Sequence, residues 1–161
     1  MIVVADAGPL IALAQIGYFN LLRSLYGELR IPSAVRDEVV TSGRGRPGGV
    51  EVSAAAWIHV VGVRDTTAVQ LLRERLDAGE SEAIVLAIEL EADLLLIDEA
   101  RGRRVAEARG LNKTGTVGML IAAKKRGLIS AVTPLLDELR AAGFRMSERL
   151  YQAGRALAGE S

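Results

Sequence analysis

The sequence contains no cysteine and only one histidine among its 161 residues. The missing cysteine excludes disulfides, thiolate catalysis and cysteine-ligated zinc or iron–sulfur centres. A single histidine also excludes a histidine-rich metal site. Any metal must therefore be held mainly by oxygen ligands, which is the chemistry of Mg²⁺ or Mn²⁺. With only one Trp, three Tyr and two Phe, the chain has few platforms on which single-stranded bases could stack.

Long apolar runs and a net charge are missing too. No apolar stretch reaches the ~18–20 residues of a membrane span, so we expect no membrane contact. The hydrophobic N-terminus has no basic segment and is interrupted by Asp6, which argues against a signal peptide. We therefore expect a cytoplasmic protein. The 20 Lys and Arg residues balance 20 Asp and Glu residues, unlike a generic basic nucleic-acid binder.

The charges are unevenly distributed along the chain. Residues 74–99 hold nine acidic residues and one arginine, and residues 100–126 hold eight basic residues and one glutamate. An acidic segment followed by a basic one suits a metal site beside a phosphate track. Solvated helix faces with local ion pairs explain the same pattern equally well.

Apolar patterning predicts one domain over residues 1–161, with a core over about 1–130 and a helical extension over about 134–158. Segments typical of strands alternate with segments of helical periodicity, which predicts an α/β fold. We expect a three-layer α/β/α sandwich with a mostly parallel sheet. The predicted strands are 2–5, 29–31, 57–63, 94–97 and 112–116. The first predicted helical region is about 9–26, with a break near Gly17. The other predicted helices are 33–40, 66–76, 80–90, 100–109, 117–126, 134–142 and 147–157. Residues 41–49 are predicted to form a loop.

Two acids directly follow apolar, strand-like runs. Asp6 follows IVVA and Asp98 follows LLLI. Ligands of open parallel sheets bind at the carboxyl ends of the strands, and a charge at that place is costly unless it is paired or binds a cation. Helix N-capping is the simpler explanation for each aspartate alone, but the pair together favours a shared site.

Further acids could converge on that site. Glu38 lies in the helix after the second strand, and Glu82 lies near the start of the 80–90 helix, with Glu80 close by. Glu80 and Glu82 are ~200° apart around a helix, so both are not expected to face one ion. The helix dipole or a solvated face also accounts for these acids. Four converging carboxylates would raise one another's pKa and require divalent cations, and such a site suits phosphoryl chemistry by metal-activated water.

Basic and hydroxyl residues follow the second aspartate. Arg101, Arg103 and Arg104 are candidates for a phosphate clamp, although a solvated helix face is equally compatible with them. Thr114 and Thr116 could position water or phosphate near the end of the fifth strand, and a turn cap is the alternative.

The sequence resembles the PIN-domain superfamily, in its VapC-like branch of predicted nucleic-acid-binding proteins. The resemblance rests on the order and spacing of segments that span most of residues 2–129, with a similar ending at 135–151. These segments are VVADAGPLIALA (3–14), IPSAVRDEVV (31–40), LDAGESEAIVLAIELEADLLLIDEARGRRVAEARGL (76–111) and GTVGMLIAAKKRGLI (115–129).

The resemblance implies a Mg²⁺- or Mn²⁺-dependent ribonuclease that hydrolyses RNA. It also implies a toxin of a toxin–antitoxin pair, with a small antitoxin partner and a homodimer. The four family acids fall on Asp6, Glu38, Glu82 and Asp98, and Glu99 could substitute for an acid that is absent at Ala100.

Two other functions remain open. Gly8, Leu96 and Ala100 depart from the family pattern and favour a non-catalytic PIN-like module that binds RNA or a protein partner. A phosphate-ester hydrolase or receiver-like domain fits less well, because Asp6 stands alone after its strand and no lysine follows an apolar strand.

Overall fold

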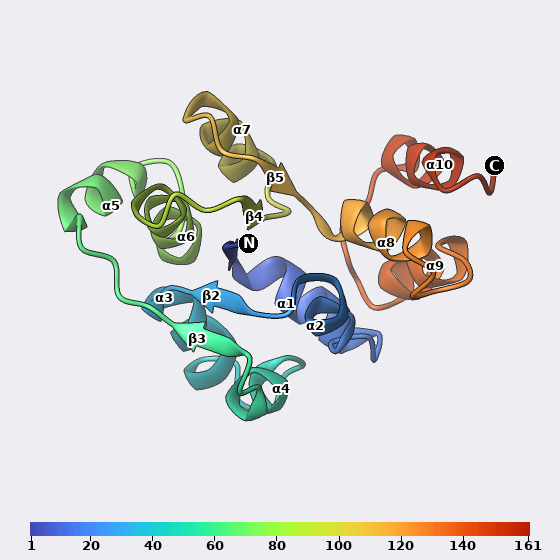
Figure 1. Ribbon diagram of the computed structural model, residues 1–161, viewed down its shortest axis with the longest axis horizontal. Coiled ribbons are helices and arrows are strands. Elements are labelled where there is room, and N and C mark those ends of the chain that lie inside the picture. Colours follow the sequence, from blue (N-terminus) through green and yellow to red (C-terminus); the bar gives the residue numbers. More distant parts are fainter.

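The computed structural model describes residues 1–161 and contains one five-stranded sheet. All neighbouring strands are parallel, in the order β3-β2-β1-β4-β5, so β1 is the central strand (Figure 1). The strands are short: β1 (Val3–Ala5), β2 (Leu29–Ile31), β3 (Ile58–Val60), β4 (Leu94–Leu96) and β5 (Lys113–Thr114).

The strands bury alternate residues on opposite faces of the sheet, as the period of two in a strand requires. Val3 and Ala5 of β1 belong to one hydrophobic cluster, whereas Val4 belongs to the other. Both faces are covered, and this confirms the three-layer α/β/α sandwich with its parallel sheet. The first layer contains α1 (Ala7–Gln15), α2 (Leu21–Tyr26), α4 (Gly49–Ala54), α8 (Thr116–Lys125), α9 (Thr133–Ala141) and α10 (Glu148–Leu157). The second layer contains α5 (Thr66–Leu72), α6 (Ala78–Glu89) and α7 (Ala100–Ala108).

The C-terminal helices complete the first layer. Leu135, Leu136 and Leu139 of α9 and Tyr151 of α10 are buried in the same cluster as α1 and α8, and the three helices α8, α9 and α10 lie together in Figure 1. Glu160 accepts hydrogen bonds from the amides of Val132 and Thr133, at 2.7 and 2.8 Å, and so fixes the end of the chain to the start of α9.

The helix predicted over 33–40 is divided into two parts. It begins as α3 (Ser33–Arg36) and continues as a π-helical turn, η1 (Asp37–Thr41). The amide of Ser42 donates to the carbonyl of Asp37 at 2.7 Å, five residues back, which is the π-helical pattern. A side chain at Gly43 would collide with the carbonyl of Val39, so this wide turn requires the glycine. The predicted 41–49 loop is a turn that ends where α4 begins at Gly49.

None of the helices is both long enough and apolar enough to cross a lipid bilayer.

We predict that Gly154→Ala separates α10 from α8. A Cβ at Gly154 would lie 2.9 Å from Val117 Cγ1 and 3.4 Å from Leu136 Cδ1, so packed side chains would have to move. We expect a loss of about 1–3 kcal/mol in the free energy of unfolding, measured by urea denaturation. Gly62→Ala is the matched control, because a Cβ there meets nothing within 4 Å. Equal stability of the two variants would contradict the packing described for α10.

Candidate active site

The central strands β1 and β4 bring two aspartates to the same edge of the sheet. The strands pair in parallel, with Ala5 opposite Leu96, and the amide of Asp6 donates to the carbonyl of Leu96 at 2.9 Å. Asp6 directly follows β1, and Asp98 follows β4 after one more buried residue, Ile97. The carboxyl edge of the sheet, where the sequence predicted a site, therefore holds both carboxylates.

Asp6 is buried without serving as a helix cap. It occupies the N-cap position of α1 but makes no capping hydrogen bond with its side chain, and it is only 6% exposed. The simpler capping explanation therefore does not apply to this residue. The pKa of Asp6 is raised to about 8, mainly by burial. The Ala7 amide opposes this rise, and the charges of Asp77, Glu80 and Glu38 contribute to it.

Asp98 is held in place by the start of α8. Its Oδ1 accepts a hydrogen bond from the Thr116 amide and its Oδ2 accepts one from the Thr116 hydroxyl, both at 2.7 Å. Burial raises the pKa of Asp98, and the bonds from Thr116 and the charge of Arg103 oppose that rise. Thr116 is itself fully buried, so it orients the carboxylate and is not placed to contact a substrate.

Glu38 approaches Asp6 from the π-helical turn. A Cβ built on Gly79 would lie 3.1 Å from Glu38 Oε1 and 3.3 Å from Asp6 Oδ1. Both carboxylate oxygens thus lie against Gly79, and a side chain at residue 79 would crowd them. Partial burial raises the pKa of Glu38, and the negative charge of Asp77 adds to the rise.

The start of α6 adds two acids. Asp77 Oδ1 accepts from the Glu80 amide at 2.7 Å, and Glu80 Oε1 accepts from the Asp77 amide at 3.0 Å, which forms a capping box. Asp77 was missed in the sequence, although the spacing of Asp77 and Glu80 is the signal of this motif. Because the cap sits at Asp77, α6 begins at Ala78, two residues before the predicted start. Burial raises the pKa of Glu80, and the charges of Asp77 and Glu99 add to the rise.

Glu82 lies elsewhere. Its Oε1 accepts a hydrogen bond from the amide of Ala34 in α3 at 3.1 Å, and the residue does not line the cleft that the other acids share. The structure therefore brings Asp6, Glu38 and Asp98 together and separates Glu82 from them. At the start of α6, Asp77 and Glu80 line the cleft, whereas Glu82, to which the resemblance assigned the third acid, does not.

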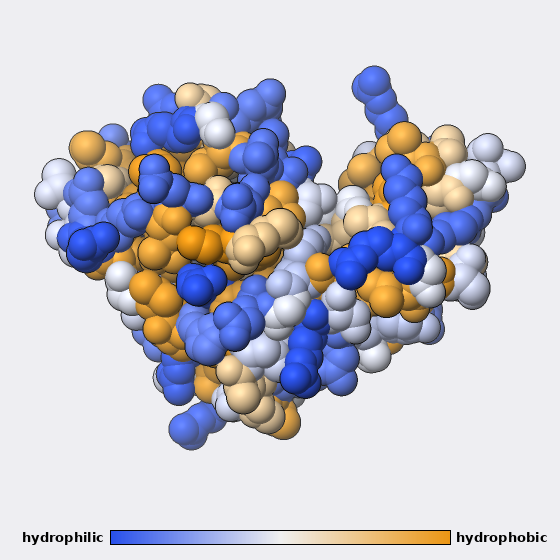
Figure 2. All heavy atoms as spheres, viewed as in Figure 1, coloured by the Kyte–Doolittle hydropathy of each residue, from blue (hydrophilic) through white to orange (hydrophobic).

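The other five acids line a cleft of about 830 Å³, and α10 bounds this cleft on the opposite side. These five are Asp6, Glu38, Asp77, Glu80 and Asp98. In Figure 2 the molecule is hollowed between the part that contains α7 and the part that contains α8 to α10. Among the predicted contacts to nucleic acid, Arg103 and Thr114 line this cleft, whereas Arg101 and Arg104 do not. Glu99 lines it too, but its carboxylate caps α7 by accepting from the Arg101 amide at 3.2 Å.

The donor chemistry of the site fits a hard divalent cation. Carboxylate oxygens are the ligands that Mg²⁺ and Mn²⁺ prefer, and the buried Asp6 carboxylate has no capping partner that would compensate its charge. No three of the acidic side chains stand in an arrangement that would hold an ion without movement. Asp6 and Glu38 both lie against Gly79, and their side chains would have to rotate for the two to share a cation.

The chain matches the PIN-domain family over residues 2–160 and belongs to it. The match covers nearly the whole chain, including α9 and α10, and it confirms the family resemblance of the sequence. The fold is thus one of the nuclease type, and the expected substrate of that type is a nucleic acid. No curated protein matches the chain significantly.

We predict that Asp6→Asn stabilises the metal-free protein at pH 8. The pKa of Asp6 in the folded protein, about 8, exceeds its ordinary value of 3.8, so the folded state binds this proton more tightly than the unfolded state. Stability contributed by the protonated form is therefore lost as pH rises from about 4 towards 8. In a chelator at pH 8, urea denaturation should show Asp6→Asn more stable than wild type by at least about 2 kcal/mol.

The difference between Asp6→Asn and wild type should shrink at pH 5, where the Asp6 carboxyl retains its proton in the folded protein. Equal or lower stability of Asp6→Asn at pH 8 would contradict the claim that burial disfavours the charge of Asp6.

Proposed function

We propose that this protein is a Mg²⁺- or Mn²⁺-dependent endoribonuclease. The observation that carries the proposal is the convergence of Asp6, Glu38 and Asp98 in one cleft at the carboxyl edge of the sheet. Asp6 is buried there without a cap, which is costly for a carboxylate unless a proton or a cation neutralises it. Membership of the PIN-domain family supports a nuclease with these acids as its centre.

The carboxylates have different roles in this proposal. Asp6 and Glu38, which both lie against Gly79, would hold the cation, while Asp98, oriented by Thr116, would complete its shell. A divalent cation bound there supplies a water of lowered pKa and neutralises charge on the phosphodiester. Glu80 and Asp77 keep the N-terminus of α6 in place and add negative charge near the ion.

The surrounding charges favour a phosphodiester that enters together with the cation. Arg103, Lys113 and Arg145 line the cleft and can contact phosphate oxygens. The acids in the cleft outnumber these cations, so without a metal the cleft repels a polyanion. RNA binding at this site should therefore depend on the divalent ion.

We further propose that the protein is the toxin of a toxin–antitoxin pair, acting on cytoplasmic RNA as a homodimer that a small antitoxin restrains. Family membership and the VapC-like order of segments support this role. Induced expression of wild type should arrest growth, and expression of Asp98→Asn should not. Equal growth of cells that express either protein would contradict the toxin role.

We predict that Asp98→Asn and Asp6→Asn each abolish Mn²⁺ binding and lower RNA cleavage by at least about a hundredfold. Isothermal calorimetry measures the first and digestion of a mixed RNA pool the second. Glu82→Gln is the matched control, because Glu82 lies outside the cleft and a glutamine oxygen can still accept from Ala34. We expect this control to bind and cleave as wild type.

If Glu82→Gln lost activity as Asp98→Asn does, the assignment of the carboxylates would be wrong. If folded wild-type protein bound no Mn²⁺ at millimolar concentration, the metallonuclease proposal would fail.

A non-catalytic PIN-like module that binds RNA or a partner is the second candidate. The hydrogen bonding of Asp98 favours it, because Thr116 already occupies both carboxylate oxygens. This candidate predicts RNA binding that a chelator leaves unchanged and no cleavage in Mn²⁺. The mixed-pool digest and a binding titration in chelator separate the two functions.

A further inference from the structure

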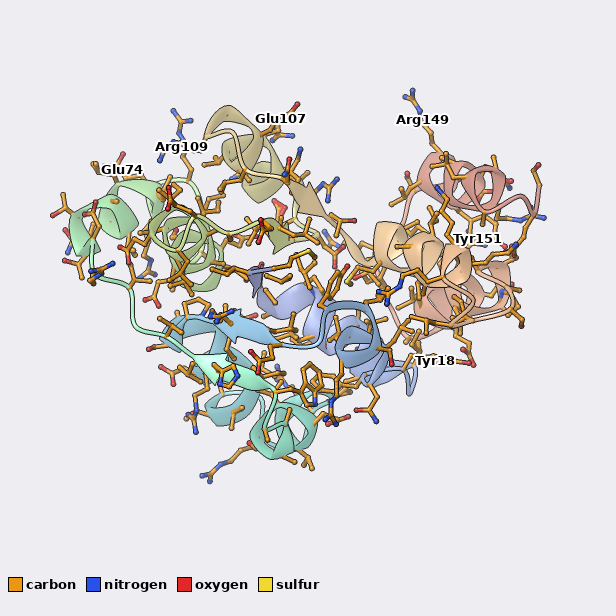
Figure 3. All side chains as sticks on the ribbon, viewed as in Figure 1. Tyr18, Glu74, Glu107, Arg109, Arg149 and Tyr151 are labelled. Carbon is orange, nitrogen blue, oxygen red and sulfur yellow. The ribbon has the colours of Figure 1, made fainter.

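Helix α10 is anchored firmly along one side. The Tyr151 hydroxyl donates to Asp137 at 2.7 Å, and the guanidinium of Arg140 lies 3.6 Å from the centre of the Tyr151 ring. Figure 3 shows Tyr151 between α10 and α9. One turn further along, Gly154 lies against Val117 of α8. These contacts fix which face of α10 meets the core and which face is turned away from it.

The neighbouring side of α10 presents an apolar stripe to the cleft, which Gly154 lines as well. The stripe consists of Leu150, Ala153 and Leu157, which are three and four residues apart and so share one face of the helix. All three line the same cleft as the carboxylates. Leu150 is 42% exposed and Leu157 is 67% exposed. Exposed apolar side chains that gather in a concavity mark a binding surface.

We propose that this stripe seats an unpaired nucleobase of the substrate while the adjacent phosphate lies at the carboxylates. The proposal rests on the proposed ribonuclease function and names the group that the second wall of the cleft recognises. A nucleotide combines an anionic phosphate with a flat, largely apolar base. In this proposal the carboxylate wall, with its cation, faces the phosphate, and the stripe on α10 faces the base. Arg103, Lys113 and Arg145 also line the cleft and suit the sugar–phosphate chain that joins these groups.

The cleft is large enough for a nucleotide. Its volume of about 830 Å³ lies within the ~300–1,000 Å³ typical of small-ligand sites. Paired bases are stacked within a duplex and cannot turn a face towards the stripe, so the seated base must be unpaired. The chain has few aromatic residues for base stacking, and aliphatic side chains on α10 offer a flat apolar surface in their place.

The test measures kcat/KM in Mn²⁺ on a short single-stranded RNA whose cleavage site has first been mapped with wild type. Leu157→Ala should lower kcat/KM by roughly fivefold to tenfold, the effect of losing apolar contact with one base. Leu157→Phe, which widens the stripe, should keep kcat/KM at or above the wild-type value. Leu71→Ala is the matched control, because Leu71 is 63% exposed on α5 and does not line the cleft. It should leave kcat/KM unchanged.

Abasic substrates identify the group that the stripe contacts. An RNA that lacks one base beside the cleavage site should be cut equally by wild type and Leu157→Ala, because the contact is already missing. A loss that persists on every abasic substrate would overturn the proposal. So would a Leu157→Ala variant that cleaves intact RNA as wild type does, and in that case a protein partner would be the better occupant.

A binding measurement separates this proposal from the ribonuclease proposal. The same oligonucleotides are titrated by fluorescence anisotropy in Mn²⁺. If wild type binds RNA without cutting it, the ribonuclease proposal is contradicted. The base-binding role of the stripe is then still tested by comparing the RNA affinities of Leu157→Ala and Leu71→Ala. If wild type cleaves RNA, and wild type, Leu157→Ala and Leu71→Ala bind it with equal affinity, only the base-binding proposal is overturned.

Discussion

The central constraint on this molecule is a carboxylate at the end of a strand that is buried on both faces. β1 is the middle strand of five, and helices cover it on either side. Asp6 follows it directly, so its side chain lies in an environment that disfavours charge, with no capping bond as compensation. The unfavourable burial of this charge can be relieved in two ways: the carboxyl keeps a proton, or a cation binds beside it.

The elements around Asp6 are arranged so that other carboxylates approach it. The capping box fixes the start of α6 and places Gly79 at the site, where the missing side chain leaves room for the carboxylates of Glu38 and Asp6. Across the sheet, Asp98 lies at the N-terminus of α8, where the helix dipole and the Thr116 amide favour a negative charge. Family membership indicates a nuclease-type fold, and the proposed nuclease centre lies where these carboxylates line the cleft.

The sequence predicted the parts of the site that depend on strand chemistry. The apolar runs before Asp6 and Asp98 identified β1 and β4, and the parallel topology placed both acids at one edge. The third acid was harder to assign, because Glu80 and Glu82 point to different sides of α6 and the choice depends on where that helix begins. The Asp77 cap fixes that start, so that Glu80 lines the cleft and Glu82 contacts α3. The role of α10 as the opposite wall depends on tertiary packing at Tyr151 and Gly154, which no local pattern reveals.

The most direct test of this account is the number of protons released when Mn²⁺ binds at pH 7. Calorimetry in buffers of different ionisation enthalpy measures that number. Because the pKa of Asp6 is about 8 in the metal-free protein, its carboxyl carries a proton at pH 7 and must lose it to bind the ion. Wild type should therefore release about one proton on binding Mn²⁺. Mn²⁺ binding without proton release would contradict the claim that burial of Asp6 is what the cation compensates.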